Sequence, residues 1–66
     1  YMEENNDLLN MIYELPYKYR VVIQLYYMEG YSLEEISEIL HKNLSTVKTR
    51  VRRAKELLKK RREDHG

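Results

Sequence analysis

The sequence predicts an all-α fold: a four-helix domain with a C-terminal helix-turn-helix and a long recognition helix. Apolar residues recur at helical spacing along most of the chain, and no segment alternates as a strand would. Residues suited to helix ends, such as Gly30 and Ser32, interrupt this pattern. We expect a single domain over 1–66, cut from a longer chain because it begins at Tyr1. The helices are expected near 6–14, 16–29, 33–40 and 44–61.

The first two helices have distinct start and stop signals. Asn5 or Asn6 suits the N-cap of the first helix, and Pro16 suits the first position of the second. Gly30 is expected to end the second helix in the left-handed conformation. This second helix is too apolar for one buried face, so we expect it to be central and covered on two sides. Part of the face that it shares with the first helix should stay open.

The stretch 32–53 predicts the helix-turn-helix. Ser32 and Glu35 have the spacing of a capping box, which starts a helix. His41, Lys42 and Asn43 should form the turn, with Asn43 as N-cap of the next helix. In that helix one face is apolar and should pack inward (Val47, Val51, Ala54 and Leu58). Two helices joined by so short a turn, the second cationic outside, suit the major groove of DNA.

The outer face of this last helix carries the candidate DNA-binding residues, which are hydroxyls and cations: Ser45, Thr46, Lys48, Thr49, Arg52 and Arg53. Lysine and arginine can donate to guanine or phosphate, and threonine can reach a base edge or a thymine methyl. Arg50 lies nearer the inner face, where we expect it to pair with Glu34 or Glu35. The cations that follow should be a solvated helix end with diffuse attraction to DNA (Lys55, Lys59, Lys60, Arg61 and Arg62).

Charge is divided unequally along the chain. The net charge of +1 combines −6 over residues 1–40 with +7 over residues 41–66. Such a division indicates one surface for a polyanion and a different partner for the rest. The chain has no cysteine, so a disulfide framework is excluded and a reducing cytoplasm suits it. We expect no cofactor and no metal, since His41 has no supporting ligand cluster, and no nucleophile–base pair or phosphate loop indicates an enzyme.

Beyond the helix-turn-helix, the sequence resembles a known family. The shared features are Leu15-Pro16, Arg20, the apolar run 21–27, Glu29-Gly30, the Ser32–Ile36 segment, and the segment from Thr46 to Ala54. Together these resemble region four, the C-terminal promoter-reading domain of bacterial RNA polymerase sigma factors, and most closely the extracytoplasmic-function group. Three positions depart from the family pattern. His41 and Ser45 stand where glycine is common, and Lys42 where an apolar residue is usual.

The resemblance implies a function and two partners. Lys48, Thr49, Arg52 and Arg53 would read the minus-35 element in the major groove. The first two helices would dock on the flap tip of the RNA polymerase β subunit, and an anti-sigma protein could compete for that surface. The docking surface is expected around four residues: Leu9, Ile12, Tyr13 and Val21. The isolated domain should be monomeric and bind DNA weakly, since the whole polymerase supplies further contacts.

Two other classes share part of the pattern. A stand-alone or response-regulator helix-turn-helix would have the 32–53 motif but not the frame of Leu15-Pro16, Arg20 and Gly30. A basic amphipathic helix over 45–62 could lie on an anionic membrane, but its apolar face lacks an aromatic anchor. Binding to duplex DNA compared with anionic vesicles across a salt series separates these alternatives.

Overall fold

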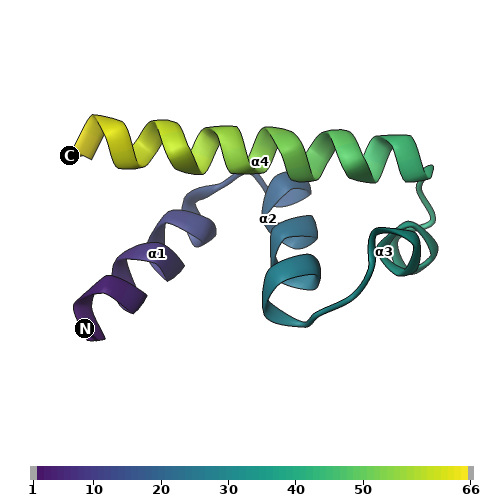
Figure 1. Cartoon of the computed structure of the whole chain (residues 1–66), viewed down its shortest axis with the longest axis horizontal. Helices are drawn as coiled ribbons and strands as arrows, with labels where there is room; N and C mark the ends of the chain where they lie inside the picture. The colour runs from purple at the N-terminus through teal and green to yellow at the C-terminus, as the bar shows by residue number, and fades with distance from the viewer. Residues whose placement is uncertain (1, 66) are drawn as a thin grey trace.

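One long helix organises the molecule. The computed structural model describes the backbone of residues 2–65 and the side chains of residues 8–61. Helix α4 (Leu44–His65) runs the length of the molecule, and α1 (Met2–Glu14) and α2 (Tyr17–Ile23) lie against one side of it. A short π-helical segment, η1 (Gln24–Met28), continues α2, and α3 (Leu33–Leu40) packs near the start of α4 (Figure 1). The described residues contain no strand, so the all-α prediction is confirmed.

Three helix boundaries differ from the sequence-based expectation. Helix α2 begins at Tyr17, and Pro16 is its N-cap with extended ψ 147, so the prediction that Pro16 is the first helical residue was wrong. Helix α1 begins at Met2, so the prediction that Asn5 or Asn6 caps it was wrong. Glutamates occupy positions 3 and 4, where the helix dipole favours negative charge, and this supports an earlier start. Helix α4 extends to His65 rather than ending near residue 61, because glycine and proline are absent between 44 and 65.

The second predicted helix is not α-helical throughout. From Gln24 the turns widen, and the Glu29 N–H donates to the Gln24 carbonyl, five residues back, at 3.0 Å. Gly30 then adopts φ 82, and the Tyr31 N–H donates to the Leu25 carbonyl at 3.0 Å. A left-handed glycine at this helix end was predicted and is confirmed. The π-helical turn was not predicted, since no residue in it is a helix breaker.

The turn between α3 and α4 forms where the sequence places it. The Ser32 hydroxyl accepts from the Glu35 N–H at 3.1 Å, and the Glu35 carboxylate accepts from the Ser32 N–H at 2.8 Å, which confirms the capping box. His41 ends α3 in the left-handed conformation, at φ 55 and ψ 45. The Lys42 N–H donates to the Ser37 carbonyl at 3.0 Å, and the Val47 N–H donates to the Asn43 carbonyl at 3.1 Å. The expected position of positive φ is therefore occupied by histidine.

The core consists of two clusters arranged along α4. One joins α3 to α2 and the start of α4 through four buried residues: Val22, Ile36, Val47 and Val51. The other joins α1 to α2 and the middle of α4 through Ile12, Leu15, Ile23 and Ala54. The predicted inward face of α4 is confirmed, and Leu57 joins Leu58 at its end. Helix α2 contributes to both clusters, as expected for the central helix.

Candidate nucleic-acid interface

Helix α4 presents its first turns to solvent because its opposite face is fixed by packing. Val47 and Val51 are buried against Ile36 of α3 and Val22 of α2. The other side chains in the first turns of α4 must therefore point elsewhere. Six of them form two stripes along α4, which differ in what lies beside them.

The outer stripe consists of Ser45, Lys48 and Arg52, at helical spacing, and all three are exposed. Arg52 pairs with Glu56 one turn further on, with 3.5 Å between Nη1 and Oε2. Both partners remain largely in solvent, and such pairs contribute little to stability. Arg52 is thus free to exchange Glu56 for another acceptor.

The side stripe consists of Thr46, Thr49 and Arg53, which lie beside the start of α2. Together with Arg50 and with Lys18 and Tyr19 of α2, they line a hollow of about 180 Å³. The sequence predicted that Thr49 and Arg53 face away from Val47 and Val51. In the structure Arg53 is exposed and Thr49 half-buried, and both lie at the edge of α4 that α2 reaches.

Lys18 and Tyr19 were not predicted as site residues. The Lys18 ammonium lies 5.2 Å from the centre of the Tyr19 ring, and the neighbouring Arg53 guanidinium lowers the pKa of the Tyr19 phenol. One signal was available, since Lys18 and Arg20 are the only cations in residues 1–40. Whether Lys18 or Arg20 reaches α4 depends on the angle at which α2 crosses α4, and the sequence alone does not predict this angle.

Arg50 does not have the partners expected of it. Among the ion pairs of residues 8–61, none joins Arg50 to Glu34 or Glu35, so that prediction was wrong. The Glu35 carboxylate already accepts from the Ser32 N–H in the capping box. Arg50 is half-buried and adds a third cation to the hollow beside Lys18 and Arg53.

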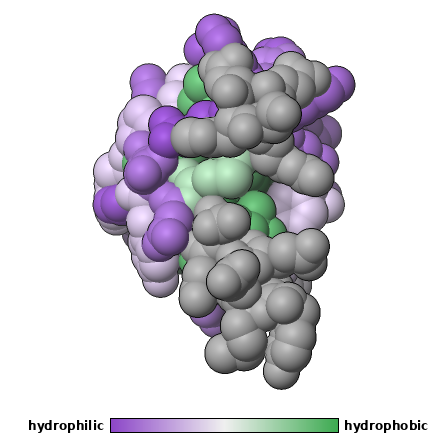
Figure 2. Space-filling view, turned by 90° about the vertical axis from the view of Figure 1, so that its left-hand side faces the viewer, coloured by the Kyte–Doolittle hydropathy of each residue, from purple (hydrophilic) through white to green (hydrophobic). Residues whose placement is uncertain are grey.

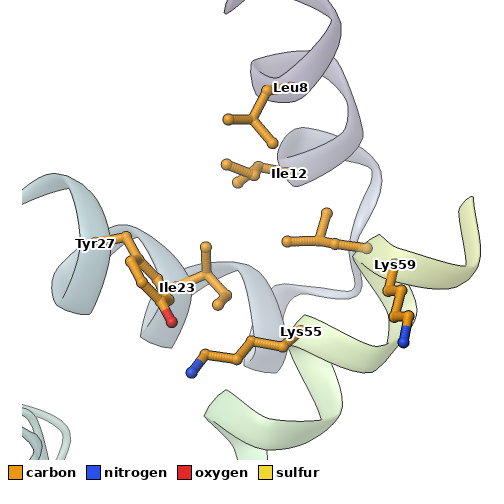
Figure 3. A pocket seen from close by; sticks show the side chains of 7 residues that line it. Leu8, Ile12, Ile23, Tyr27, Lys55 and Lys59 are labelled. Atoms are coloured by element: carbon orange, nitrogen blue, oxygen red, sulfur yellow. The ribbon is translucent and has the colours of Figure 1, made fainter. Parts of the chain in front are cut away.

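A second, apolar hollow lies on the side of α4 near its C-terminal half. It has a volume of about 680 Å³ and is lined by Leu8, Ile12, Ile23, Tyr27, Lys55, Leu58 and Lys59. Figure 2 shows apolar surface at this end of the molecule, with hydrophilic surface beside it. In Figure 3 the side chains of Leu8 and Ile12 extend from α1 toward those of Ile23 and Tyr27. This is the expected open face between the first two helices, completed by α4.

The four predicted docking residues do not gather at this hollow. Ile12 is buried in the core and contributes to its floor. Tyr13, which is exposed, and Val21 line a different depression with residues of η1. Leu9 is half-buried and lines neither depression. Leu8, Tyr27 and Leu58 line the hollow but were not singled out from the sequence, because their meeting depends on how three helices cross.

Two cations of the C-terminal half have specific neighbours. The Lys55 ammonium lies 5.4 Å from the centre of the Tyr27 ring, and the neighbouring Tyr27 raises the pKa of Lys55. Arg61 pairs with Glu14 at the end of α1. The prediction that both cations merely solvate the helix end was therefore wrong. They connect α4 to η1 and to α1.

No group of acidic, histidine or cysteine side chains in the described part of the chain could hold a metal ion. Within the same residues, no helix is long and apolar enough to cross a membrane.

The fold and the cationic face of α4 define a helix-turn-helix DNA-binding domain. Residues 5–58 match the family model described as Sigma-70, region 4, and the chain belongs to this family. The chain is similar to the ECF RNA polymerase sigma factor SigW of Bacillus subtilis, with 46% identity over 63 residues. It is also similar to the RNA polymerase sigma factor SigV of the same organism, with 45% identity over 56 residues.

These alignments cover 96% and 85% of the chain. They cover 34% of each relative, so the chain spans about a third of their length. The family match favours a sigma-factor domain over a stand-alone or response-regulator protein.

Proposed function

We propose that this chain is the promoter-reading domain of a bacterial extracytoplasmic-function sigma factor, and that α4 reads the minus-35 element in the major groove. The observation that carries the proposal is the exposed outer stripe of α4, on a helix whose opposite face is fixed in the core. A recognition helix needs an exposed face and a backbone held in place by the core, because side chains read bases precisely only from a fixed backbone.

The two stripes of α4 suit different parts of the duplex. Lys48 and Arg52 of the outer stripe can donate to guanine O6 and N7 at the groove floor. Thr46, Thr49 and Arg53 at the edge, together with Lys18 of α2, suit the phosphates of the groove wall. Ser45 lies in the first turn of α4, where free N–H groups and the helix dipole also favour a phosphate.

The apolar hollow is the surface that we assign to RNA polymerase. A helix of the β flap can place apolar side chains against Leu8, Ile23 and Leu58, while Lys55 and Lys59 at the rim can meet acidic groups. Of the four docking residues expected from the sequence, this surface includes Ile12. An anti-sigma protein would compete for the same surface. The domain would act in the bacterial cytoplasm, as a monomer when isolated, without cofactor or enzymatic activity.

The DNA half of the proposal is tested by selection from a random pool of duplexes, using the 66-residue chain as bait. We expect one sequence motif to be enriched and weak affinity for it at physiological salt, because one recognition helix makes few contacts. Anionic vesicles serve as the comparison. Stronger binding to vesicles than to the selected duplex, or a pool without enrichment, would contradict this function.

The polymerase half is tested with two matched variants. Leu8→Asp places a charge at the rim of the hollow, and Ile39→Asp places one on α3; the two wild-type side chains are 48% and 45% exposed. Both should fold, since neither site is in the core. We expect Leu8→Asp to lose binding to bacterial core RNA polymerase and Ile39→Asp to keep it. Equal behaviour of the two variants would remove the hollow as the docking surface.

A further inference from the structure

Two adjacent arginines of α4 have different surroundings. Arg52 lies on the outer stripe, and its ion partner Glu56 is on the same helix. Arg53 lies on the side stripe and lines the small hollow with Tyr19 and Lys18 of α2. The position of the Arg52 guanidinium is therefore set within α4 alone, whereas that of Arg53 depends on α2.

Tyr19 is well placed to hold another side chain. Its ring packs against the buried cluster of Ile12, Leu15, Ile23 and Ala54, so one end of the side chain is anchored in the core. The Lys18 ammonium covers the ring at 5.2 Å. Tyr19 also lines the hollow with Arg53, Thr46 and Thr49. A tyrosine with an apolar base and a polar tip can thus connect the core to the interface.

We propose that Tyr19 is a positioning residue: it holds the Arg53 guanidinium at the edge of α4, beside Lys18, where it meets a DNA phosphate rather than a base. This inference rests on the proposed function and assigns different roles in DNA binding to the two arginines. Arg52 contributes sequence preference, and Arg53 contributes affinity that is independent of sequence.

The physical benefit of this arrangement is preorganisation. An arginine side chain has several rotatable bonds, and ordering them on binding costs entropy. Tyr19 restricts the guanidinium before DNA arrives. The neighbouring Arg53 side chain also lowers the pKa of the Tyr19 phenol, as expected when a cation lies beside a group that can become an anion.

The contact itself can be tested without DNA. Tyrosines labelled with ¹³C in the ring report each phenol's titration by NMR, and Tyr19→Phe assigns the signal. We expect Tyr19 to titrate below the ordinary value of 10.0 and to return toward it in Arg53→Ala, but not in Arg52→Ala. A Tyr19 titration unchanged by Arg53→Ala would overturn the proposal.

The role of the contact is tested by binding to the duplex that the chain selects and to a scrambled duplex. Tyr19→Phe keeps the ring and removes the hydroxyl, and Tyr31→Phe makes the same change in a tyrosine that does not line this hollow. We expect Tyr19→Phe to weaken both duplexes alike, by about three- to ten-fold, as for one lost hydrogen bond of ordinary strength. We expect Tyr31→Phe to match the wild type.

A double-variant cycle shows whether Tyr19 acts through Arg53. In an Arg53→Ala background, Tyr19→Phe should cause no further loss, whereas in an Arg52→Ala background the two losses should multiply. Equal losses in both backgrounds, or a loss confined to the preferred duplex, would overturn the proposal. If the wild type binds no duplex, the proposed function fails, while the titration still decides the contact between Tyr19 and Arg53.

Discussion

Replacing His41 by glycine is expected to stabilise the helix-turn-helix. His41 ends α3 at φ 55 and ψ 45, a conformation that costs a residue with a Cβ about 1–2 kcal/mol. Glycine removes this cost, but it adds conformational freedom to the unfolded chain, worth about 0.4–1 kcal/mol. His41 is exposed, and its side chain makes no hydrogen bond within the described residues, so little else is lost.

The net gain should be about 0.5–1 kcal/mol, which for a domain of this size raises the melting temperature by about 2–8 °C. Urea unfolding followed by far-ultraviolet circular dichroism measures the gain in the free energy of unfolding. Lys42→Gly is the matched control: within residues 2–65 His41 is the non-glycine residue with positive φ, so glycine at 42 should only destabilise. If His41→Gly lowers the unfolding midpoint as much as Lys42→Gly does, the left-handed turn is not a source of strain.

Three further changes follow from the same contacts. Ile36→Ala removes a fully buried side chain at a cost of about 2–5 kcal/mol, as large as the stability expected for so small a domain, so thermal melting should show a largely unfolded chain. Glu56→Gln removes the carboxylate paired with Arg52, and titration with fluorescent duplexes should show about two- to five-fold tighter binding to matched and scrambled DNA alike. Lys59→Ala or Lys60→Ala should weaken all duplexes equally and reduce the salt slope by about one unit or less, which a salt series measures.

Local signals made much of the fold predictable. Ser32 and Glu35 form the capping box because both partners lie within one helical turn. Gly30 and His41 end their helices through their own positive φ, which is also a local property. The buried face of α4 also follows from spacing alone. These features depend on residues close in sequence, which is where pattern and propensity carry information.

Features that depend on helix crossings were not predictable. The side stripe exists because α2 brings Tyr19 to α4, and the apolar hollow exists because three helices meet around Ile12 and Leu58. Periodicity shows that Thr49 lies off the buried face, but not which neighbour covers it. The π-helical turn at Gln24 has no local signal either, since no glycine or proline marks it.

Base reading by the outer stripe of α4 is the central claim, and Arg52 tests it most directly. Affinities of the wild type, Arg52→Ala and Lys59→Ala are compared on the selected duplex and on its scrambled counterpart, at several salt concentrations. Arg52→Ala should cost about 1–3 kcal/mol on the selected duplex and flatten the preference between the two, while Lys59→Ala leaves that preference intact. If Arg52→Ala leaves the ratio of the two affinities unchanged, the recognition surface does not lie on the outer stripe.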